Sequence, residues 1–199
     1  RVRVTGPALW THFGLSGPAA LNISRFWNRA TLESREPQLR LSFLPSEDFE
    51  SIERRILEEV SNHPRTSLAG LVRKWLPTRV ADAVLAHLSL QPRLALGQVT
   101  KAQRRALCHG LVEFPLDVRG TRGYGFAEVT AGGISLKEVN PKTMESRKTP
   151  GLYLVGEVLD VDARIGGFNF QWAWSSGFVA GRAIASSLET TNQGTADNA

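Results

Sequence analysis

Apolar residues recur at helical spacing through the middle of the chain. In the segment 46–60, one helical face carries the apolar side chains Phe49, Ile52, Ile56, Leu57 and Val60. Ser46, followed by Phe49 and Glu50, is typical of a helix start. Similar spacing, interrupted by prolines, predicts further helices over 66–75, 78–87 and 100–111. The pattern therefore predicts a cluster of about four helices within residues 46–111.

Short alternating or apolar runs on both sides of this cluster predict strands. These runs cover residues 1–4, 9–13, 38–44, 114–119 and 127–130. Turn residues fill 14–18 and 120–125, and the segment that begins at Pro18 has the spacing of a short helix up to Trp27. The ends of the chain are therefore expected to mix strands with a little helix.

The last third has a different pattern. Residues 151–156 form an apolar run that ends at a glycine, which predicts a short strand. A polar loop, 157–169, follows, and the small residues of 171–188 predict a closely packed helix. Residues 189–199 are polar and are expected to form a flexible tail.

Composition narrows the class of protein. The 199 residues carry a net charge of +5, but basic residues alternate with acidic ones, which favours a solvated surface over a nucleic-acid partner. No apolar run is long enough for a membrane span, and the single cysteine, Cys108, cannot form an internal disulfide. We therefore expect a cytoplasmic protein without a membrane partner, in which Cys108 is buried and has no catalytic role. The chain begins at Arg1 and its only methionine is Met144, so we interpret it as part of a longer protein.

The loop and helix of the last third suit an electron-rich ligand. A helix that starts after Gly166 and Gly167 has free backbone N–H groups and a partial positive charge at its first turn. Glycines there let the backbone come close to the ligand. An ordinary strand-to-helix connection with glycine turns has the same spacing, so the pattern alone leaves both interpretations open.

Three blocks of sequence resemble one family in the same order. They are THFGLSGPAALNISR (Thr11–Arg25), GTRGYGFAEVTAGGISLKEVNPKTMES (Gly120–Ser146) and PGLYLVGEVLDVDARIGGFNFQWAWSSGFVAGRAIA (Pro150–Ala185). They are similar to the BaiN-like flavoproteins, a family of NAD(P)/FAD-dependent or aminoacetone-oxidase-type oxidoreductases. The resemblance covers nearly the whole chain and corresponds to the C-terminal half of the family's members.

The resemblance implies an α/β fold with an α+β insertion. Residues 1–126 would be the end of an inserted β-barrel and helical domain, and 127–188 the C-terminal part of a glutathione-reductase-like FAD-binding domain. The G-x-G-x-x-G loop that holds the dinucleotide is not in this sequence, so a missing N-terminal Rossmann half is an expected partner. The implied activity is hydride or two-electron transfer between a small-molecule substrate and FAD, with NAD(P)H as a candidate electron donor. The chain alone would be inactive. The alternative is a truncated or split fragment without catalysis that needs a separate dinucleotide-binding half.

The same resemblance assigns roles to particular residues. Glu157, after Gly156, would accept hydrogen bonds from the ribityl chain of FAD. Backbone N–H groups would face the pyrimidine edge of the flavin ring from Gly166, Gly167, Phe168 and Asn169. A small-residue segment would leave room for substrate over the ring at Thr130, Gly132 and Gly133.

His12 and Arg122 are the candidates for catalysis on the substrate side. His12 could transfer a proton, and Arg122 could bind a carboxylate. A structural histidine and a surface arginine explain the same residues equally well, so both alternatives stay open. The sequence contains no pattern that predicts a metal site.

Overall fold

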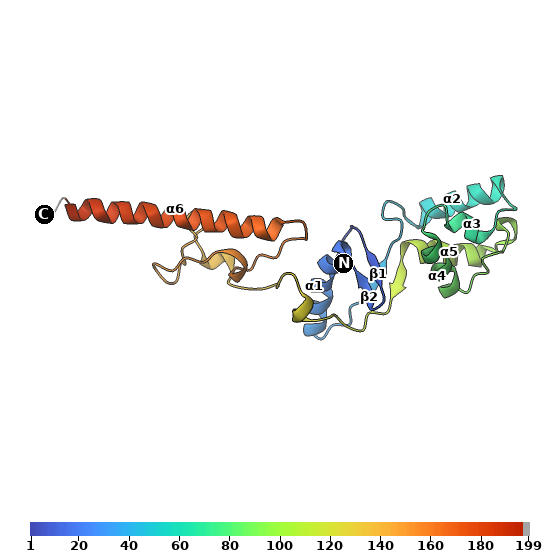
Figure 1. Cartoon of the computed structure of the whole chain (residues 1–199). Helices are drawn as coiled ribbons and strands as arrows, with labels where there is room; N and C mark the ends of the chain where they lie inside the picture. Colours follow the sequence, from blue (N-terminus) through green and yellow to red (C-terminus); the bar gives the residue numbers. More distant parts are fainter. Residues whose placement is uncertain (197–199) are drawn as a thin grey trace. The chain divides into compact units, whose positions relative to one another are not determined.

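The computed structural model describes residues 1–196, and its contacts divide the chain into two compact units. The helical unit is Glu33–Arg119. The split unit combines Arg1–Leu32 with the chain from Gly120 onward. Figure 1 labels the helices of both units. Each unit is described by itself.

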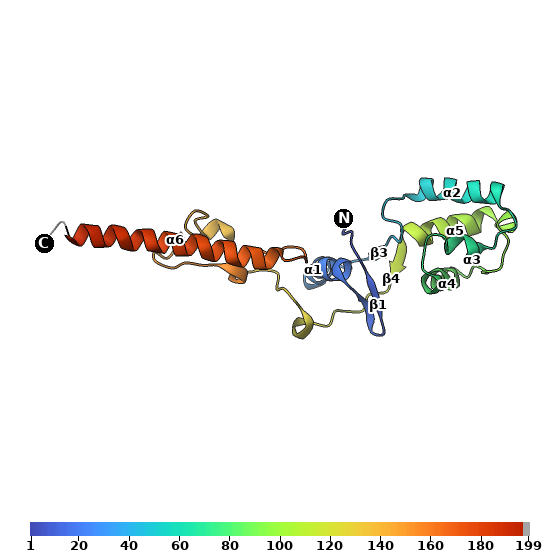
Figure 2. The same ribbon diagram turned by 45° about the horizontal axis from the view of Figure 1, so that its top comes forward.

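Helices form most of the helical unit, as the apolar spacing predicted. They are α2 (Phe49–Asn62), α3 (Leu68–Val72), α4 (Thr78–His87) and α5 (Lys101–Val112), with a single 3₁₀ turn at Leu96–Gln98. Two strands, β3 (Leu39–Leu41) and β4 (Phe114–Leu116), pair antiparallel beside them. In Figure 2, α5 runs through the middle of the cluster, next to α2. Apolar faces of the helices meet in a core that includes Ile52, Ile56, Leu71, Leu85, Leu107 and Leu111, all fully buried.

Two helices of this unit begin with reciprocal caps. The Asp48 carboxylate accepts a hydrogen bond from the Ser51 backbone N–H at 2.8 Å, and the Ser51 hydroxyl accepts one from the Asp48 N–H at 3.0 Å. Thr100 and Gln103 exchange the same two bonds at the start of α5. The prediction that α2 starts at Ser46 is therefore wrong by two residues, because Asp48 provides the capping carboxylate. The Ser51 N–H stabilises that charged carboxylate and lowers the pKa of Asp48.

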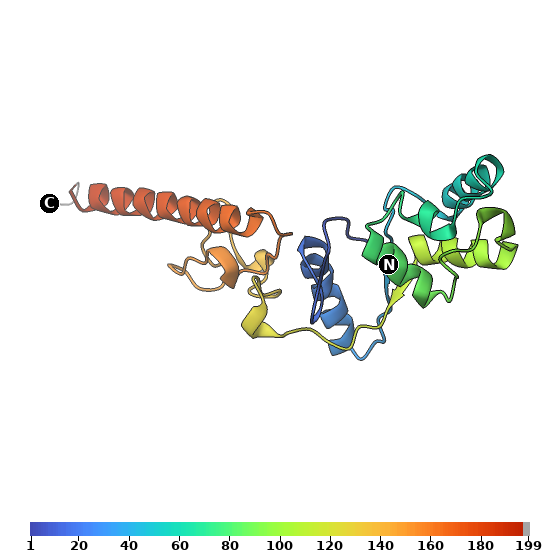
Figure 3. The ribbon, with the colours of Figure 1, turned by 45° about the vertical axis from the view of Figure 1, so that its right-hand side comes forward.

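The split unit starts with a hairpin and a helix. Strands β1 (Leu9–Thr11) and β2 (Gly14–Ser16) pair antiparallel, and α1 (Pro18–Leu32) follows them and contacts β2. Single 3₁₀ turns follow at Tyr124–Phe126, Leu136–Glu138 and Gly156–Val158. The long helix α6, Phe168–Ala196, ends the described chain, and Figure 3 shows the loops that precede it beside its first half. A small core joins them, built from Val139, Met144, Leu159 and Ala180.

Several predicted strands are not formed. Residues 1–4 and 127–130 have no strand, and 151–156 make only the isolated bridge between Glu145 and Tyr153. The apolar run at 151–156 uses its backbone in single bonds, such as Leu154 N–H to Met144 C=O at 3.0 Å. A strand needs a neighbour that satisfies a whole row of N–H and C=O groups, and the described residues supply no such neighbour. The run at 114–119 becomes a strand only as far as Leu116.

The last helix is longer than predicted. It begins at Phe168 and continues to Ala196, past the expected end at Leu188, so it overlaps the predicted tail 189–199. Residues 197–199 lie outside the described residues. None of the helices in the described chain combines the length and the apolar character that crossing a bilayer requires. The assignment of 1–126 to an inserted domain and of 127–188 to a flavin domain stays a prediction.

The only cysteine is buried, as predicted. Cys108 lies on α5 in the core of the helical unit with no exposed surface. Burial disfavours the thiolate and raises the pKa of the Cys108 thiol to about 11. This environment does not suit a thiol nucleophile.

We expect Cys108 to resist thiol reagents at pH 8. Its thiolate fraction there is about a thousandth, against about a quarter for a free cysteine, so labelling should be at least ~100-fold slower than in urea-unfolded chain. Below about pH 8.5, the ordinary pKa of an unfolded cysteine, the neutral buried thiol makes its full contribution to the free energy of unfolding. Because the pKa of Cys108 is raised in the folded state, this contribution is lost as the pH rises towards 11. Ellman's reagent measures the rate, and equally fast labelling of the folded and unfolded chain would contradict the prediction.

Candidate functional site

The turn at Gly156 is attached to the first turns of α6 by two hydrogen bonds. The Gly156 N–H donates to the Ser176 hydroxyl at 3.0 Å, and the Trp172 indole N–H donates to the Gly156 carbonyl at 3.1 Å. The Ser176 hydroxyl in turn donates to the Trp172 carbonyl at 2.7 Å, and its side chain is only 2% exposed. Gly156 has a φ of +68°, a conformation that favours glycine. The turn that carries Glu157 is therefore fixed beside the start of α6.

Glu157 and Thr130, predicted from separate blocks, are in direct contact. The Glu157 carboxylate accepts a hydrogen bond from the Thr130 backbone N–H at 2.9 Å. The side chain of Glu157 stays exposed. A carboxylate has about four acceptor positions, so this bond leaves capacity for further donors.

Gly133 lies against the backbone that follows Glu157. Ile134 N–H donates to the Val158 carbonyl and Asp160 N–H to the Ile134 carbonyl, each at 2.9 Å. A Cβ on Gly133 would stand 2.7 Å from the Val158 carbonyl oxygen, and its φ is +137°. Gly132 also has a positive φ, +104°, but open space around it. Position 133 thus requires glycine, because a side chain there would collide with the Val158 carbonyl. At position 132 the positive φ alone favours glycine.

The glycine loop before α6 is held by its own asparagine. The Asn169 side chain accepts from the Ala163 N–H at 2.9 Å and donates to the Ala163 carbonyl at 3.1 Å. Gly166 and Gly167 have φ values of +129° and +85°. Because the Asn169 amide is used inside the loop, only its backbone N–H is available to a ligand, as for Gly167 and Phe168 at the first turn of the helix.

Helix α1 braces the same loop with two residues that the sequence patterns did not identify. The Asn22 side chain accepts from the Ile165 N–H at 3.0 Å. Arg25 forms an ion pair with the Asp162 carboxylate and also donates to the Asp162 carbonyl at 2.9 Å. The three-residue spacing of Asn22 and Arg25 on a predicted helix is the only sequence signal for this contact. Asp162 is thus a structural partner of Arg25.

One cation lies beside the first turn of α6, in a loop that also carries the acids Glu157, Asp160 and Asp162. The exposed Arg164 guanidinium lies 4.8 Å from the centre of the Phe168 ring, beside the positive end of α6. A Cβ at Gly167 would meet no atom within 4 Å, so the space beside its Cα is open. Free N–H donors, positive φ glycines and a nearby cation fit the electron-rich pyrimidine edge of a flavin ring.

His12 and Arg122 belong to a different cluster in the split unit. His12 is exposed at the turn of the β1–β2 hairpin, and its ring contacts Phe13 edge to face at 5.2 Å. The Arg122 guanidinium lies 4.4 Å from the centre of the same Phe13 ring. The structure therefore brings the two candidates together through Phe13. Among the described residues, neither forms a hydrogen bond with the loop 157–169.

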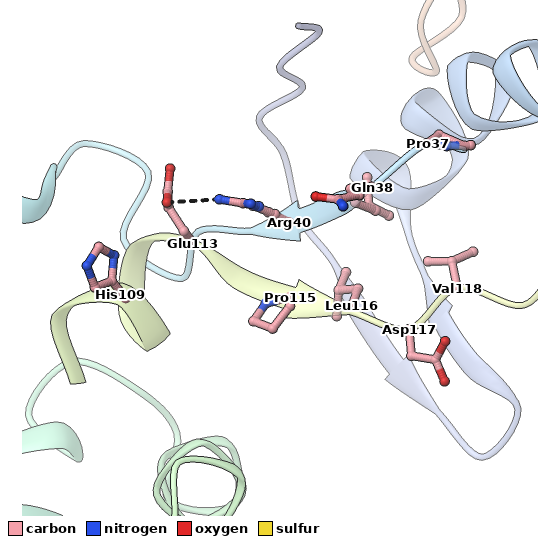
Figure 4. Close-up of a pocket in the computed structure, with 10 residues that line it drawn as sticks. Pro37, Gln38, Arg40, His109, Glu113, Pro115, Leu116, Asp117 and Val118 are labelled. Atoms are coloured by element: carbon pink, nitrogen blue, oxygen red, sulfur yellow. Dashed lines mark hydrogen bonds and ion pairs between the residues drawn. The ribbon is translucent and has the colours of Figure 1, made fainter. Parts of the chain in front are cut away.

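The helical unit has an open hollow of about 560 Å³ along β3 and β4. Figure 4 shows its lining, in which Arg40 forms an ion pair with Glu113 at 3.1 Å. None of the predicted site residues lines it. In the described part of the chain, no group of three or more His, Cys, Asp or Glu side chains could hold a metal ion.

Most of the chain matches a known protein family. Residues 14–183 match the family described as HI0933-like protein Rossmann domain. The chain is 41% identical over 168 residues to the ribosomal RNA dihydrouridine synthase of Escherichia coli (strain K12), covering 84% of this chain and 40% of that protein. The Haemophilus influenzae protein of the same name is 35% identical over 177 residues, covering 89% of this chain and 42% of that protein.

A third relative has a different name. The 3-dehydro-bile acid delta(4,6)-reductase of Clostridium scindens is 32% identical over 181 residues, covering 91% of this chain and 44% of that protein. The chain thus spans about two fifths of the length of these curated relatives.

Replacing Ser176 with alanine should destabilise the split unit by about 1–3 kcal/mol, because the buried Gly156 N–H loses its acceptor. The matched control is Ser175→Ala, which removes an exposed hydroxyl on the next position of α6 and should change stability by no more than about 0.5 kcal/mol. Urea unfolding and amide exchange at Gly156 measure both changes. Equal effects of the two substitutions would show that the buried bond is unimportant.

Proposed function

The chain belongs to the HI0933-like family of Rossmann-domain proteins, and we propose that it supplies the flavin-ring-facing half of an FAD-dependent oxidoreductase. One observation carries the proposal. Segments far apart in the sequence meet beside the first turns of α6, where Thr130 contacts Glu157 and Gly133 lies against residues 158–160. These segments belong to the blocks that resemble flavoproteins.

In this proposal each segment has a separate task. Glu157, held by the Thr130 N–H, accepts hydrogen bonds from the hydroxyls of the ribityl chain. The N–H groups of Gly166–Asn169 stabilise negative charge at the pyrimidine edge of the ring. Gly132 and Gly133 keep the neighbouring backbone free of side chains, which leaves room for the substrate.

FAD, when bound, would supply two-electron chemistry, with NAD(P)H as the proposed electron donor. The other half of the cofactor needs a pyrophosphate-binding loop that this chain does not contain. We therefore propose that a Rossmann-type N-terminal half completes the site in a glutathione-reductase-like domain. Residues 1–126 would belong to a domain inserted into it. The present chain alone is inactive in this proposal.

We propose uridine in ribosomal RNA as the substrate of the full-length protein. Two relatives carry that activity in their name, and both are more similar to this chain than the bile acid reductase is. This proposal departs from two expectations: a small-molecule substrate, which the resemblance implied, and no nucleic-acid partner, which rested on the scattered basic residues. Scattered basic residues are compatible with a substrate that is reached through a few local contacts.

A steroid-like small molecule is the second candidate substrate, because the Clostridium scindens relative is named for a bile acid. The two names share one type of chemistry, in which a ring double bond is reduced. A fragment without catalysis, which only complements a dinucleotide-binding half, is the alternative to both.

The decisive experiment compares flavin content with and without the N-terminal half. We expect the 199-residue chain alone to purify colourless, and co-expression with the N-terminal half, or the full-length protein, to give about one FAD per protein by absorbance near 450 nm. A stoichiometric yellow complex of this chain alone would contradict the division of the site. Absence of flavin from the full-length protein would overturn the proposed function.

Two glycine substitutions in the full-length protein test whether the flavin ring binds at the loop before α6. Gly167→Ala should weaken FAD binding by about tenfold, or about 1.4 kcal/mol, because a methyl group would stand where the ring approaches the backbone. Gly151→Ala is the matched control, since Gly151 has nearly the same φ, +79° against +85°, and the same open surroundings. Fluorescence titration of the apoprotein with FAD measures both, and equal affinities would remove the loop from the site.

A further inference from the structure

Exposed aromatic side chains gather around Arg122 on the split unit. The Arg122 guanidinium lies 4.4 Å from the centre of the Phe13 ring and 3.4 Å from that of Phe126. Phe13 is 50% exposed, Phe126 59% and Tyr124 85%. We call Phe13, Arg122, Tyr124 and Phe126 the aromatic–arginine surface. A planar cation thus contacts two rings that are each at least half exposed.

The groups on this surface are those that recognise unpaired nucleobases. Bases stack on aromatic rings and on the planar guanidinium of arginine, and arginine N–H groups also bind phosphate oxygens. In the described part of the chain, Arg122 forms no ion pair with a carboxylate, so no acidic group competes for its charge. The surface therefore combines base stacking with attraction for a polyanion.

Helix α1 connects this surface to the loop before α6. The Thr121 hydroxyl, next to Arg122, contacts the Asn28 side chain at 3.4 Å, while Asn22 binds the backbone of Ile165. Asn22 and Asn28 are about 9 Å apart along the helix axis, at 1.5 Å per residue. That separation equals the rise of about three stacked bases. A strand bound at this surface would therefore lie beside the same helix that braces the glycine loop.

We propose that the aromatic–arginine surface binds unpaired bases of an RNA strand close to the base that is reduced. The inference rests on the proposed function, because it takes an RNA substrate as given. Beyond the RNA substrate itself, we propose which surface binds the strand and that base stacking provides the binding. The surface explains why both residues nominated for the substrate side, His12 and Arg122, contact Phe13.

The test measures binding of a fluorescently labelled single-stranded oligouridine by anisotropy, with the 199-residue chain and with the full-length protein. Phe126→Ala and Arg122→Ala should each weaken binding by about 5- to 150-fold, the usual range for loss of one stacked base. Arg79→Ala is the matched control, because Arg79 is an exposed arginine on α4 of the helical unit and its loss changes the net charge equally. Arg79→Ala should change the affinity by less than about twofold.

Two further measurements separate stacking from charge. Arg122→Lys keeps the charge without the planar group, so it should bind as weakly as Arg122→Ala if stacking dominates. An abasic oligonucleotide of the same length should bind wild type and Phe126→Ala with equal affinity. Restored binding by Arg122→Lys, or the same Phe126→Ala loss on abasic RNA, would overturn the stacking role.

The outcomes also distinguish this inference from the proposed function. A flavin-containing full-length protein that binds RNA no more weakly after Phe126→Ala and Arg122→Ala would overturn this inference alone. Absence of RNA binding by the wild-type full-length protein would overturn it as well. Loss of FAD with unchanged RNA binding in the Phe126→Ala full-length protein would also overturn this inference, because the surface would then contact another part of the protein instead of RNA. A flavin-free full-length protein would instead overturn the proposed function.

Discussion

The hydrogen bonds between Gly156, Trp172 and Ser176 are the contacts on which the split unit's candidate site depends. A buried polar group without a partner is costly, so the Ser176 hydroxyl and the Gly156 N–H stabilise each other where both are buried, next to Trp172, which packs against the small core of this unit. They hold the turn that carries Glu157 against α6, and this turn positions the segment that contains Thr130 and Gly133. Glu157 can then reach Thr130, and Gly133 can pass beside residues 158–160.

A second set of contacts gives the glycine loop its shape. Asn169 closes the loop on Ala163, and α1 holds it from outside through Asn22 and Arg25. These bonds leave the N–H groups at the start of α6 without a role inside the loop, next to the cation of Arg164. The polar interactions thus leave an open backbone edge with N–H donors, which is the property that a flavin ring or another electron-rich group would use.

Prediction from the sequence succeeded where the signal was periodic. The spacing of Ile52 and Ile56 on α2, and the burial of Cys108, follow from apolar faces that meet within one unit. It failed at residues 151–156, because a strand depends on a neighbour that a local pattern cannot supply. In the site, Gly166 and Gly167 stood out by their chemistry, and Glu157 through the family resemblance. Asn22 and Ser176 did not, because their contacts join positions 143 and 20 residues apart in the sequence.

The most direct test of the account is an experimental structure of the full-length protein with its flavin bound. The account predicts that backbone N–H groups among Gly166–Asn169 lie within about 3.2 Å of the pyrimidine N1 or O2 atoms, and that the Glu157 carboxylate contacts the ribityl hydroxyls. A flavin ring bound elsewhere, for example along the hollow beside Arg40 and Glu113, would contradict the account.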